Sequence, residues 1–366
     1  MGLYVLKYPY RRMLLPVAAL LGGVHPDVLS YLATGVSAAT AACYVFAAER
    51  PWLLACAIVL TLLRMTLNTL DGVLAIRRGR LTLKGEVVNA LPDRYSVILV
   101  VAGIALSGLC RPVLGLLGLA SMLLVSYVGV LGKALGASWQ HQGPLGKVER
   151  LICIMALTLV QLVLLRGGRT GWTILGWPLT PLELAMIAFT ALGQVTVFNR
   201  TRGILRQVAK LQWQRDGSAP GRALVVYDSS TGNTAKVAGA IAEALGAELS
   251  CVDEVRDVSG HDLIVIGSPT ISSRPTDKVM RFLRGHPELG SYAAFVTYGA
   301  PVIGAGKARK ALRCFEQAIG RRPLARFRCK GRHALVNTYR RHPDEDDLLS
   351  AFLFGVGLAK AQENRP

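Results

Sequence analysis

Long apolar runs with few charged residues fill the chain up to about residue 200. A helix needs about 20 apolar residues to cross the hydrocarbon core of a bilayer. Six runs meet or approach this length, the fifth being the shortest: residues 28–48, 52–75, 87–109, 113–135, 151–165 and 182–198. This pattern predicts an all-α membrane domain with six transmembrane helices.

The pattern of hydrophobic positions changes after residue 221. Short apolar runs at 223–227, 262–270 and 293–299 end in turns rich in glycine or hydroxyl side chains, and a helical pattern covers 235–245. Buried strands that alternate with helices are typical of an α/β fold with a doubly wound parallel sheet. We therefore expect a membrane domain over 1–215, a linker at 216–221 and a second domain over 222–366.

Composition agrees with a membrane protein, because 52% of the 366 residues are hydrophobic and the mean hydropathy is +0.39. Lys and Arg gather beside the apolar runs and give a formal net charge of +19. In that position they attract anionic lipid headgroups, so nucleic acid is not the expected partner. Their distribution predicts a multi-pass protein of the cell (inner) membrane with both termini and the second domain in the cytoplasm. The apolar stretch 13–21 has no convincing cleavage site and is expected to form an interfacial helix.

Polar residues interrupt the apolar pattern in the second and third predicted helices. Arg64, Asn68 and Asp71 share one helical face in the second helix. In the third, Asn89 and Asp93 recur at a spacing of four residues. Polar groups at membrane depth are costly and mark functional sites, and oxygen ligands beside arginines suit a diphosphate bound through magnesium.

The spacing of these residues resembles the signature D-x2-D-G-x2-A-R-x8-G-x3-D-x3-D of the CDP-alcohol phosphatidyltransferase family. The match runs without a gap over Asn68, Asp71, Gly72, Ala75, Ile76, Gly85, Asn89 and Asp93. Two signature aspartates are asparagines and the signature arginine is Ile76, with Arg77 next to it. An asparagine can still offer a carbonyl oxygen to a hard cation, but two negative charges are lost, and Glu86 would restore one.

The resemblance implies a phospholipid-synthesis enzyme, a phosphotransferase that transfers a phosphatidyl or related group from a CDP-linked lipid to an acceptor hydroxyl and releases CMP. The partners would be a CDP-diacylglycerol-like lipid and an acceptor alcohol, with Asp93 as the catalytic base. Mg²⁺ (or Mn²⁺) would bind to Asn68, Asp71, Glu86, Asn89 and Asp93. The CDP group would bind to Gly72, Ala75, Arg77 and Gly85. The resemblance also leads us to expect a homodimer through the transmembrane helices.

A second basic patch lies near the fifth and sixth predicted helices. The loop before the fifth helix resembles the corresponding loop of the same family, and it contains Lys147 and Arg150. Together with Arg200 these residues are expected to pair with phosphate of the acceptor. Their alternative role is to set membrane topology, and the alternative for the Asn68 to Asp93 cluster is an inactive polar packing seam.

The second domain begins with a strand, a short turn and a helix, which together form an anion site because free backbone N–H groups face the ligand. The turn resembles the FMN-phosphate loop of flavodoxins, and its residues are Ser229, Ser230, Thr231, Gly232, Asn233 and Thr234. Later turns match the places where flavodoxins hold the isoalloxazine ring, at Pro269, Thr270, Tyr298 and Gly299. The resemblance predicts a flavodoxin-like fold with FMN as cofactor.

Two features of this domain leave its role open. The loop after Thr270 has no Trp or Tyr to stack on a flavin, and the segment 304–310 is basic, which favours an acidic or membrane-bound redox partner. The alternative function is therefore a membrane-anchored electron carrier of the flavodoxin type whose transmembrane domain is a catalytically diverged anchor. A third is a lipid-binding scaffold without enzymatic activity.

Overall fold

The computed structural model describes residues 10, 12–21, 23–77, 83–138, 143–144, 146–217, 221–287, 289–333 and 338–363. The chain divides into two compact units, Met1–Ile204 and Leu205–Pro366. This division falls inside a long helix, α8 (Pro181–Asp216), ahead of the linker predicted at 216–221.

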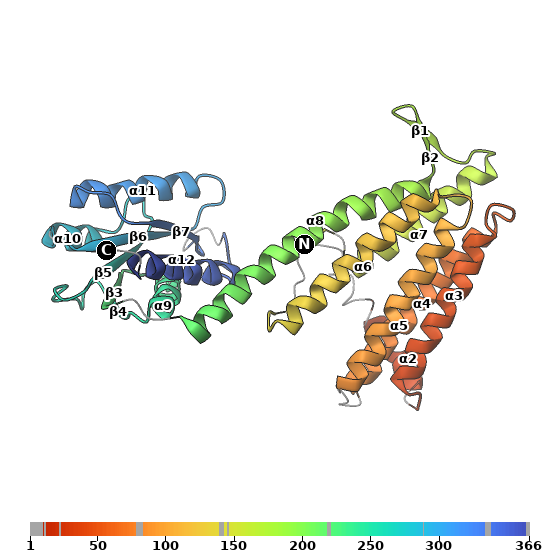
Figure 1. The fold of residues 1–366 in the computed structure, drawn as a ribbon, viewed down its shortest axis with the longest axis horizontal. Helices are drawn as coiled ribbons and strands as arrows, with labels where there is room; N and C mark the ends of the chain where they lie inside the picture. The colour runs from red at the N-terminus through yellow and green to blue at the C-terminus, as the bar shows by residue number, and fades with distance from the viewer. Residues whose placement is uncertain are drawn as a thin grey trace. The chain divides into compact units, whose positions relative to one another are not determined.

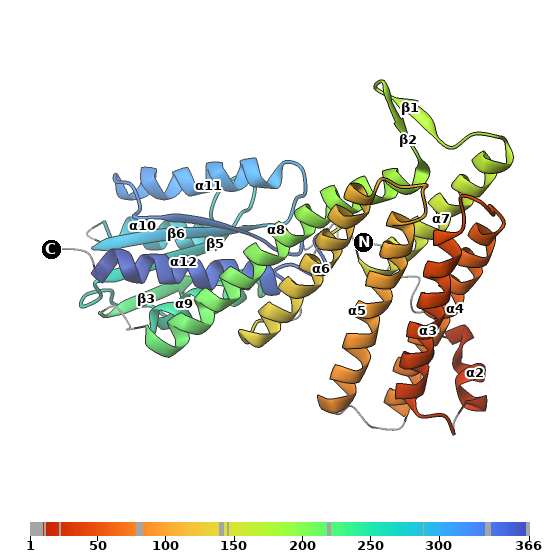
Figure 2. The ribbon, with the colours of Figure 1, turned by 45° about the vertical axis from the view of Figure 1, so that its right-hand side comes forward.

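The first unit is a bundle of long helices (Figures 1 and 2). α3 packs on α4 and α5, α5 packs on α6, and α4 packs on α7. The buried core includes Tyr44, Ile104, Met122 and Phe189. The helices that precede α8 are α2 (Leu15–Leu20), α3 (Pro26–Val45), α4 (Leu53–Arg77), α5 (Leu83–Ala105), α6 (Pro112–Ala134) and α7 (Lys147–Arg166).

Five helices of the described part are long and apolar enough to cross a membrane: α3, α4, α6, α7 and α8. The prediction of a multi-pass, all-α membrane region is therefore confirmed. α5, at the position of the third predicted span, contains side chains outside the described residues. The stretch expected to be an interfacial helix contains α2, whose Ala18 packs with Leu70 and Leu74 of α4.

Small residues let two helices of the bundle approach closely. A Cβ atom on Gly103 of α5 would lie 2.6 Å from Cα of Ala41 on α3, closer than real contacts allow. We expect Gly103→Ala to lower the free energy of unfolding by about 1–3 kcal/mol, because the helices must move apart. Gly35→Ala on α3 is the matched control, since its Cβ would meet nothing within 4 Å. Unfolding of the purified variants in one detergent tests this, and equal stability of the two would contradict the close packing.

A short hairpin between α7 and α8 has no counterpart in the sequence prediction. Its strands are β1 (Trp172–Ile174) and β2 (Trp177–Leu179). Leu175 and Gly176 between them have φ values of 52° and 81°, as a type I′ turn requires. The strands escaped prediction because each has only three residues and their apolar side chains are exposed.

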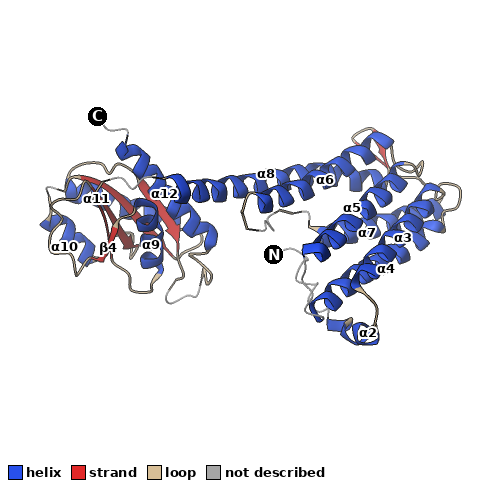
Figure 3. Ribbon diagram, turned by 60° about the horizontal axis from the view of Figure 1, so that its bottom comes forward, coloured by secondary structure: helices blue, strands red, loops and turns tan. Residues whose placement is uncertain are grey.

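The second unit is a three-layer α/β domain with a parallel sheet between two helical layers (Figure 3). The strand order is β4-β3-β5-β6-β7, the order of doubly wound flavodoxin-like sheets. α9 and α12 pack against one face and α10 and α11 against the other. The elements are β3 (Ala223–Tyr227), α9 (Asn233–Leu245), β4 (Glu248–Cys251), β5 (Leu263–Pro269), α10 (Asp277–Gly285), β6 (Ser291–Tyr298), α11 (Gly304–Ile319), β7 (Arg326–Lys330) and α12 (Glu345–Glu363).

The last turns of α8 belong to this second unit. Trp213 packs against the core of α9 and α12 and donates a hydrogen bond from Nε1 to the carbonyl oxygen of Ala244 over 2.8 Å. Lys210 lies over the ring of Phe352, with Nζ 4.5 Å from the centroid. The α/β domain therefore includes residues ahead of the predicted linker.

Candidate functional site

Asp93 is the centre of a buried polar cluster in the helical unit. Its side chain is 7% exposed, and that of Arg64 on α4 is 2% exposed. Arg64 Nη2 donates to Asp93 Oδ1 over 3.3 Å, and Asn68 Nδ2 donates to the same oxygen over 3.4 Å. Arg64 and Asn68 are one helical turn apart, so one face of α4 presents both donors to α5.

Further arginines surround this carboxylate. Arg94 Nη2 lies 3.7 Å from Asp93 Oδ2. Arg150 at the start of α7 interacts electrostatically with Arg94, Asp93, Arg200 and Arg64. This set has four guanidinium groups and one carboxylate, so it carries a net positive charge and favours an anion.

Arg150 and Arg64 line one small cavity of about 20 Å³, which has room for about one water molecule. Arg150 is 8% exposed, and its Nη1 has no hydrogen-bond partner among the described residues. A buried guanidinium with an unused donor is costly unless a ligand or water accepts from it. Arg200 Nη1, by contrast, donates to the carbonyl oxygen of Val125 over 2.9 Å.

Asp71 lies one turn after Asn68 and is 3% exposed. Its Oδ2 accepts a hydrogen bond of 2.9 Å from Ser30 Oγ on α3. A buried carboxylate together with amide oxygens is a donor set that suits a hard divalent cation. A Cβ on Gly72 would meet nothing within 4 Å, so packing within the described chain does not require glycine there.

The structure thus brings three of the predicted site residues onto neighbouring faces of α4 and α5: Asn68, Asp71 and Asp93. The side chains of Arg77, Glu86, Asn89 and Lys147, and Gly85, lie outside the described residues. The sequence placed Arg64 on the polar face but gave it no role, and it did not single out Arg94 or Ser30. Little in the sequence indicated these three roles, because each side chain bonds to a residue on another helix.

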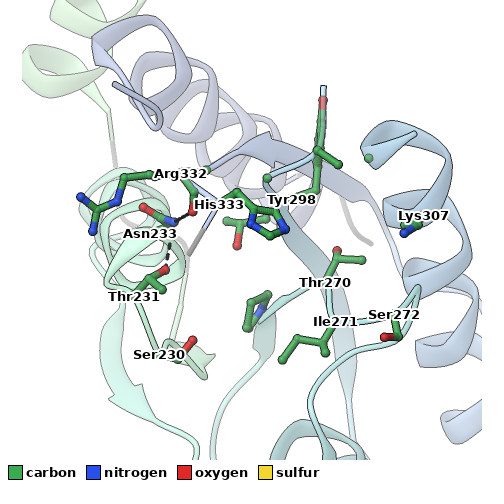
Figure 4. A pocket seen from close by; sticks show the side chains of 16 residues that line it. Ser230, Thr231, Asn233, Thr270, Ile271, Ser272, Tyr298, Lys307, Arg332 and His333 are labelled. Atoms are coloured by element: carbon green, nitrogen blue, oxygen red, sulfur yellow. Dashed lines mark hydrogen bonds between the residues drawn. The ribbon is translucent and has the colours of Figure 1, made fainter. Parts of the chain in front are cut away.

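The α/β unit has its own cavity, at the carboxyl ends of its strands (Figure 4). Its volume is about 470 Å³. Seven of the predicted FMN residues line it: Ser230, Thr231, Asn233, Pro269, Thr270, Tyr298 and Gly299. The sequence missed several polar residues of its wall, among them Lys307, Arg332 and His333, which come from segments far along the sequence from the phosphate loop.

The phosphate loop is held by hydrogen bonds within the domain. Asn233 Nδ2 donates to Thr231 Oγ1 and to the carbonyl oxygen of Arg332, both over 2.9 Å. Gly232 caps α9 with a φ of 77°, which favours glycine. Thr234 does not line the cavity: its side chain is 1% exposed, and its hydroxyl is 2.9 Å from that of Thr297, which does line it.

Two hydroxyl groups of this region lack a partner within the described residues. Ser229 Oγ and Thr270 Oγ1 are buried and make no hydrogen bond there. Such groups are destabilising unless a ligand or water satisfies them. Tyr298 meets Tyr339 edge to face at 6.5 Å between centroids, and burial raises the pKa of the Tyr298 phenol above its ordinary value.

Residues 224–347 match the family model described as "Flavodoxin domain". This match agrees with the flavodoxin-like domain that the phosphate-loop motif predicts over 222–366.

Among curated proteins, this chain is 33% identical over 134 residues to an archaetidylinositol phosphate synthase of Methanothermobacter thermautotrophicus. The match covers 37% of this chain and 62% of the relative. The chain is 29% identical over 150 residues to the protein of the same name from Aeropyrum pernix, covering 40% of this chain and 73% of the relative. This chain thus spans less than two thirds of the Methanothermobacter relative. Among solved structures, Mycobacterium tuberculosis phosphatidylinositol phosphate synthase with CDP-DAG bound is 24% identical, with a TM-score of 0.41 over 54% of this chain and 92% of that chain.

Proposed function

We propose that the helical unit transfers a phosphatidyl or related group from a CDP-linked lipid to the hydroxyl of an acceptor alcohol, with release of CMP. The observation that carries this proposal is the buried Asp93 carboxylate, which receives hydrogen bonds from Arg64 and Asn68 and is surrounded by further guanidinium groups. Such a site can hold phosphate groups and a proton acceptor together in a place with little water. The similarity to two phospholipid synthases supports the same reaction class.

Each residue of the cluster has a role in this proposal. Asp93 accepts the proton of the acceptor hydroxyl, whose oxygen then attacks the β-phosphorus of the CDP-linked lipid, and CMP leaves. Arg64 and Asn68 hold the carboxylate in place. Asp71, with oxygens of Asn68, Asn89 and Glu86, would hold Mg²⁺ or Mn²⁺, which when bound supplies charge neutralisation on the diphosphate.

We further propose that the acceptor carries a phosphate of its own. The arginines around Asp93 exceed what one carboxylate can neutralise, and in the described part of the chain Nη1 of Arg150 has no hydrogen-bond partner. A phosphorylated polyol would provide the missing acceptor oxygens. The relatives, named for synthesis of archaetidylinositol phosphate, agree with this acceptor class.

The test is magnesium-dependent CMP release by the purified full chain in lipid nanodiscs, with CDP-diacylglycerol or CDP-archaeol as donor. We expect release with a phosphorylated polyol and much less with the same polyol lacking phosphate. No CMP with either donor and any acceptor would overturn the transferase and leave the membrane-anchored electron carrier as the better function.

For the α/β domain we propose FMN as the ligand, with a redox partner that is acidic or bound to the membrane. Support comes from the cavity at the carboxyl ends of the strands and from the buried hydroxyl of Thr270, which lines it. The buried hydroxyl of Ser229 lies next to the lining residue Ser230 in the phosphate loop. A yellow purified protein, or one that turns yellow on addition of FMN, is the expected result. A protein that stays colourless with excess FMN would overturn this ligand.

Thr270 allows a sharper test of the same ligand. We expect Thr270→Val to raise the stability of the FMN-free protein by about 1 kcal/mol, because an unsatisfied buried hydroxyl is removed, and to weaken FMN binding roughly two- to tenfold. Thr297→Val is a comparison for stability without FMN only, because Thr297 also lines the cavity. It leaves the Thr234 hydroxyl without this partner and should destabilise the protein. Thermal unfolding without FMN measures the stability, and the shift on adding FMN measures the affinity. A loss of stability in Thr270→Val without FMN would contradict the assignment of the Thr270 hydroxyl to FMN binding.

The proposals on placement follow the predicted topology. We propose that both termini and the α/β domain are cytoplasmic, that the domain boundary lies near the end of α8, and that the helical unit forms a homodimer. Accessibility of residues in the α/β domain to a protease added to sealed, inside-out vesicles tests the first.

A further inference from the structure

The β1–β2 hairpin between α7 and α8 has one face made entirely of apolar side chains. Its register pairs Trp172 with Leu179 and Ile174 with Trp177, and cross-strand partners lie on the same face of a two-stranded ribbon. The opposite face carries Thr173 and Pro178. At the tip, Leu175 is 95% exposed, and Trp177 beside it is 65% exposed.

In the described part of the chain this face stays partly open: Trp172 is 41% exposed, Ile174 38% and Trp177 65%, and Leu179 is half-buried. A hairpin of two strands is marginally stable by itself in water, and an exposed cluster of two tryptophans with aliphatic residues marks an interaction surface. We expect the exposed part of this face to be covered by something other than the described residues.

The two ends of the hairpin, which we call its feet (Thr170 before β1 and Thr180 after β2), are fixed at the ends of helices long enough to span a membrane. The chain turns at Gly168, and the carbonyl oxygen of Thr170 then accepts a hydrogen bond of 2.8 Å from Nε2 of the buried Gln161 on α7. Gln161 lies five residues before the end of α7, which corresponds to about 7 Å along the helix axis. The hydrogen bond from Gln161 therefore ties the start of the hairpin to the last turns of α7. At the other foot, Thr180 Oγ1 donates to the carbonyl oxygen of Leu109 over 2.6 Å.

The surroundings of the feet are those of a lipid boundary. Val163 on α7 and Val113 on α6 are 61% and 66% exposed in helices long enough to cross a membrane. Arg166 and Arg169 precede the hairpin, and the segment 167–182 contains no acidic residue. Basic side chains beside tryptophans match the phosphate and acyl boundary of a bilayer, where Trp is enriched. A strand of three residues reaches about 10 Å, comparable to the headgroup layer.

We infer that the β1–β2 hairpin is an interfacial anchor whose apolar face lies in the headgroup and upper acyl region of the lipid. The hairpin lies where α7 ends and α8 begins, whereas Arg64 and Asp93 lie close to the midpoints of α4 and α5. Lipid covers the apolar face of the hairpin, and the hairpin in turn fixes the depth at which the connection between α7 and α8 lies in the bilayer. This inference does not depend on the proposed transferase activity.

The experiment measures tryptophan fluorescence of the full chain in nanodiscs that hold one copy each, with lipids brominated near the headgroup or left unbrominated. The chain has five tryptophans, so the emission of Trp172→Phe/Trp177→Phe is subtracted from that of the wild type. We expect this difference signal to lose most of its intensity with the brominated lipid. Bromines placed deep in the acyl chains should quench it less.

Trp213→Phe provides the control, because Trp213 packs in the α/β unit and its difference signal should not change with bromination. If the double variant does not fold, the single variants Trp172→Phe and Trp177→Phe give the two halves of the signal separately. An unquenched hairpin signal in one-copy discs would overturn the inference. If that signal shifted to the blue only in discs holding two copies, the face would belong to a second chain instead of to lipid.

Discussion

Asp93→Asn should lower CMP release by about 10²–10⁴-fold, the usual contribution of a general base. The amide cannot accept the proton of the acceptor hydroxyl, although it keeps nearly the same shape. Initial rates at saturating donor and acceptor, in nanodiscs, measure the effect.

The matched control for this variant is Asp216→Asn, which makes the same chemical change at a side chain that is 60% exposed and pairs with its neighbour Arg215. It should leave the rate unchanged. If Asp93→Asn retained more than a tenth of the wild-type rate, Asp93 would not be the base.

The same substitution should also reduce stability strongly. Removing the carboxylate leaves the Arg64 guanidinium buried without its anion and next to other arginines. Breaking one side of a buried ion pair costs about 3–5 kcal/mol. We expect the free energy of unfolding of Asp93→Asn to fall by an amount in this range, as measured by unfolding in a fixed detergent.

Arg64→Met in the Asp93→Asn background separates the two effects. The double variant should regain most of the lost stability, because the unpaired buried cation is gone, while CMP release stays low. Recovery of activity together with stability would show that Asp93 acts through the fold alone. A purely additive loss of stability would mean that Arg64 and Asp93 do not form a pair.

Much of the architecture was predictable because it depends on local patterns. The strand predicted at 223–227 is β3, and the helix predicted at 235–245 lies within α9. The edge strands β4 and β7 were missed, because their mixed sequences, such as Arg-Phe-Arg-Cys-Lys in β7, lack the continuous apolar run of a central strand. Propensity alone is weak at the edge of a sheet.

The residues of the candidate sites could be predicted where they belong to one sequence motif. They could not be predicted where folding brings together residues from separate segments. Asn68, Asp71 and Asp93 followed from spacing. The partners Ser30 and Arg94 depended on how helices meet, and no spacing along the chain encodes that. The same reason applies to Lys307, Arg332 and His333 of the α/β domain. They line the same cavity as the phosphate loop, although they are far from it along the sequence.

The position of Trp213 decides where the α/β domain can be cut from the rest of the chain. A fragment that starts at the predicted linker would lack this side chain, so Ala244 would lose its hydrogen bond from the indole and Phe352 would lose a neighbour in the same cluster. The resulting exposed apolar groove would favour aggregation. A fragment that begins at Leu205, the first residue of the second compact unit, keeps this helical turn and is the form in which flavin binding can be studied apart from the membrane.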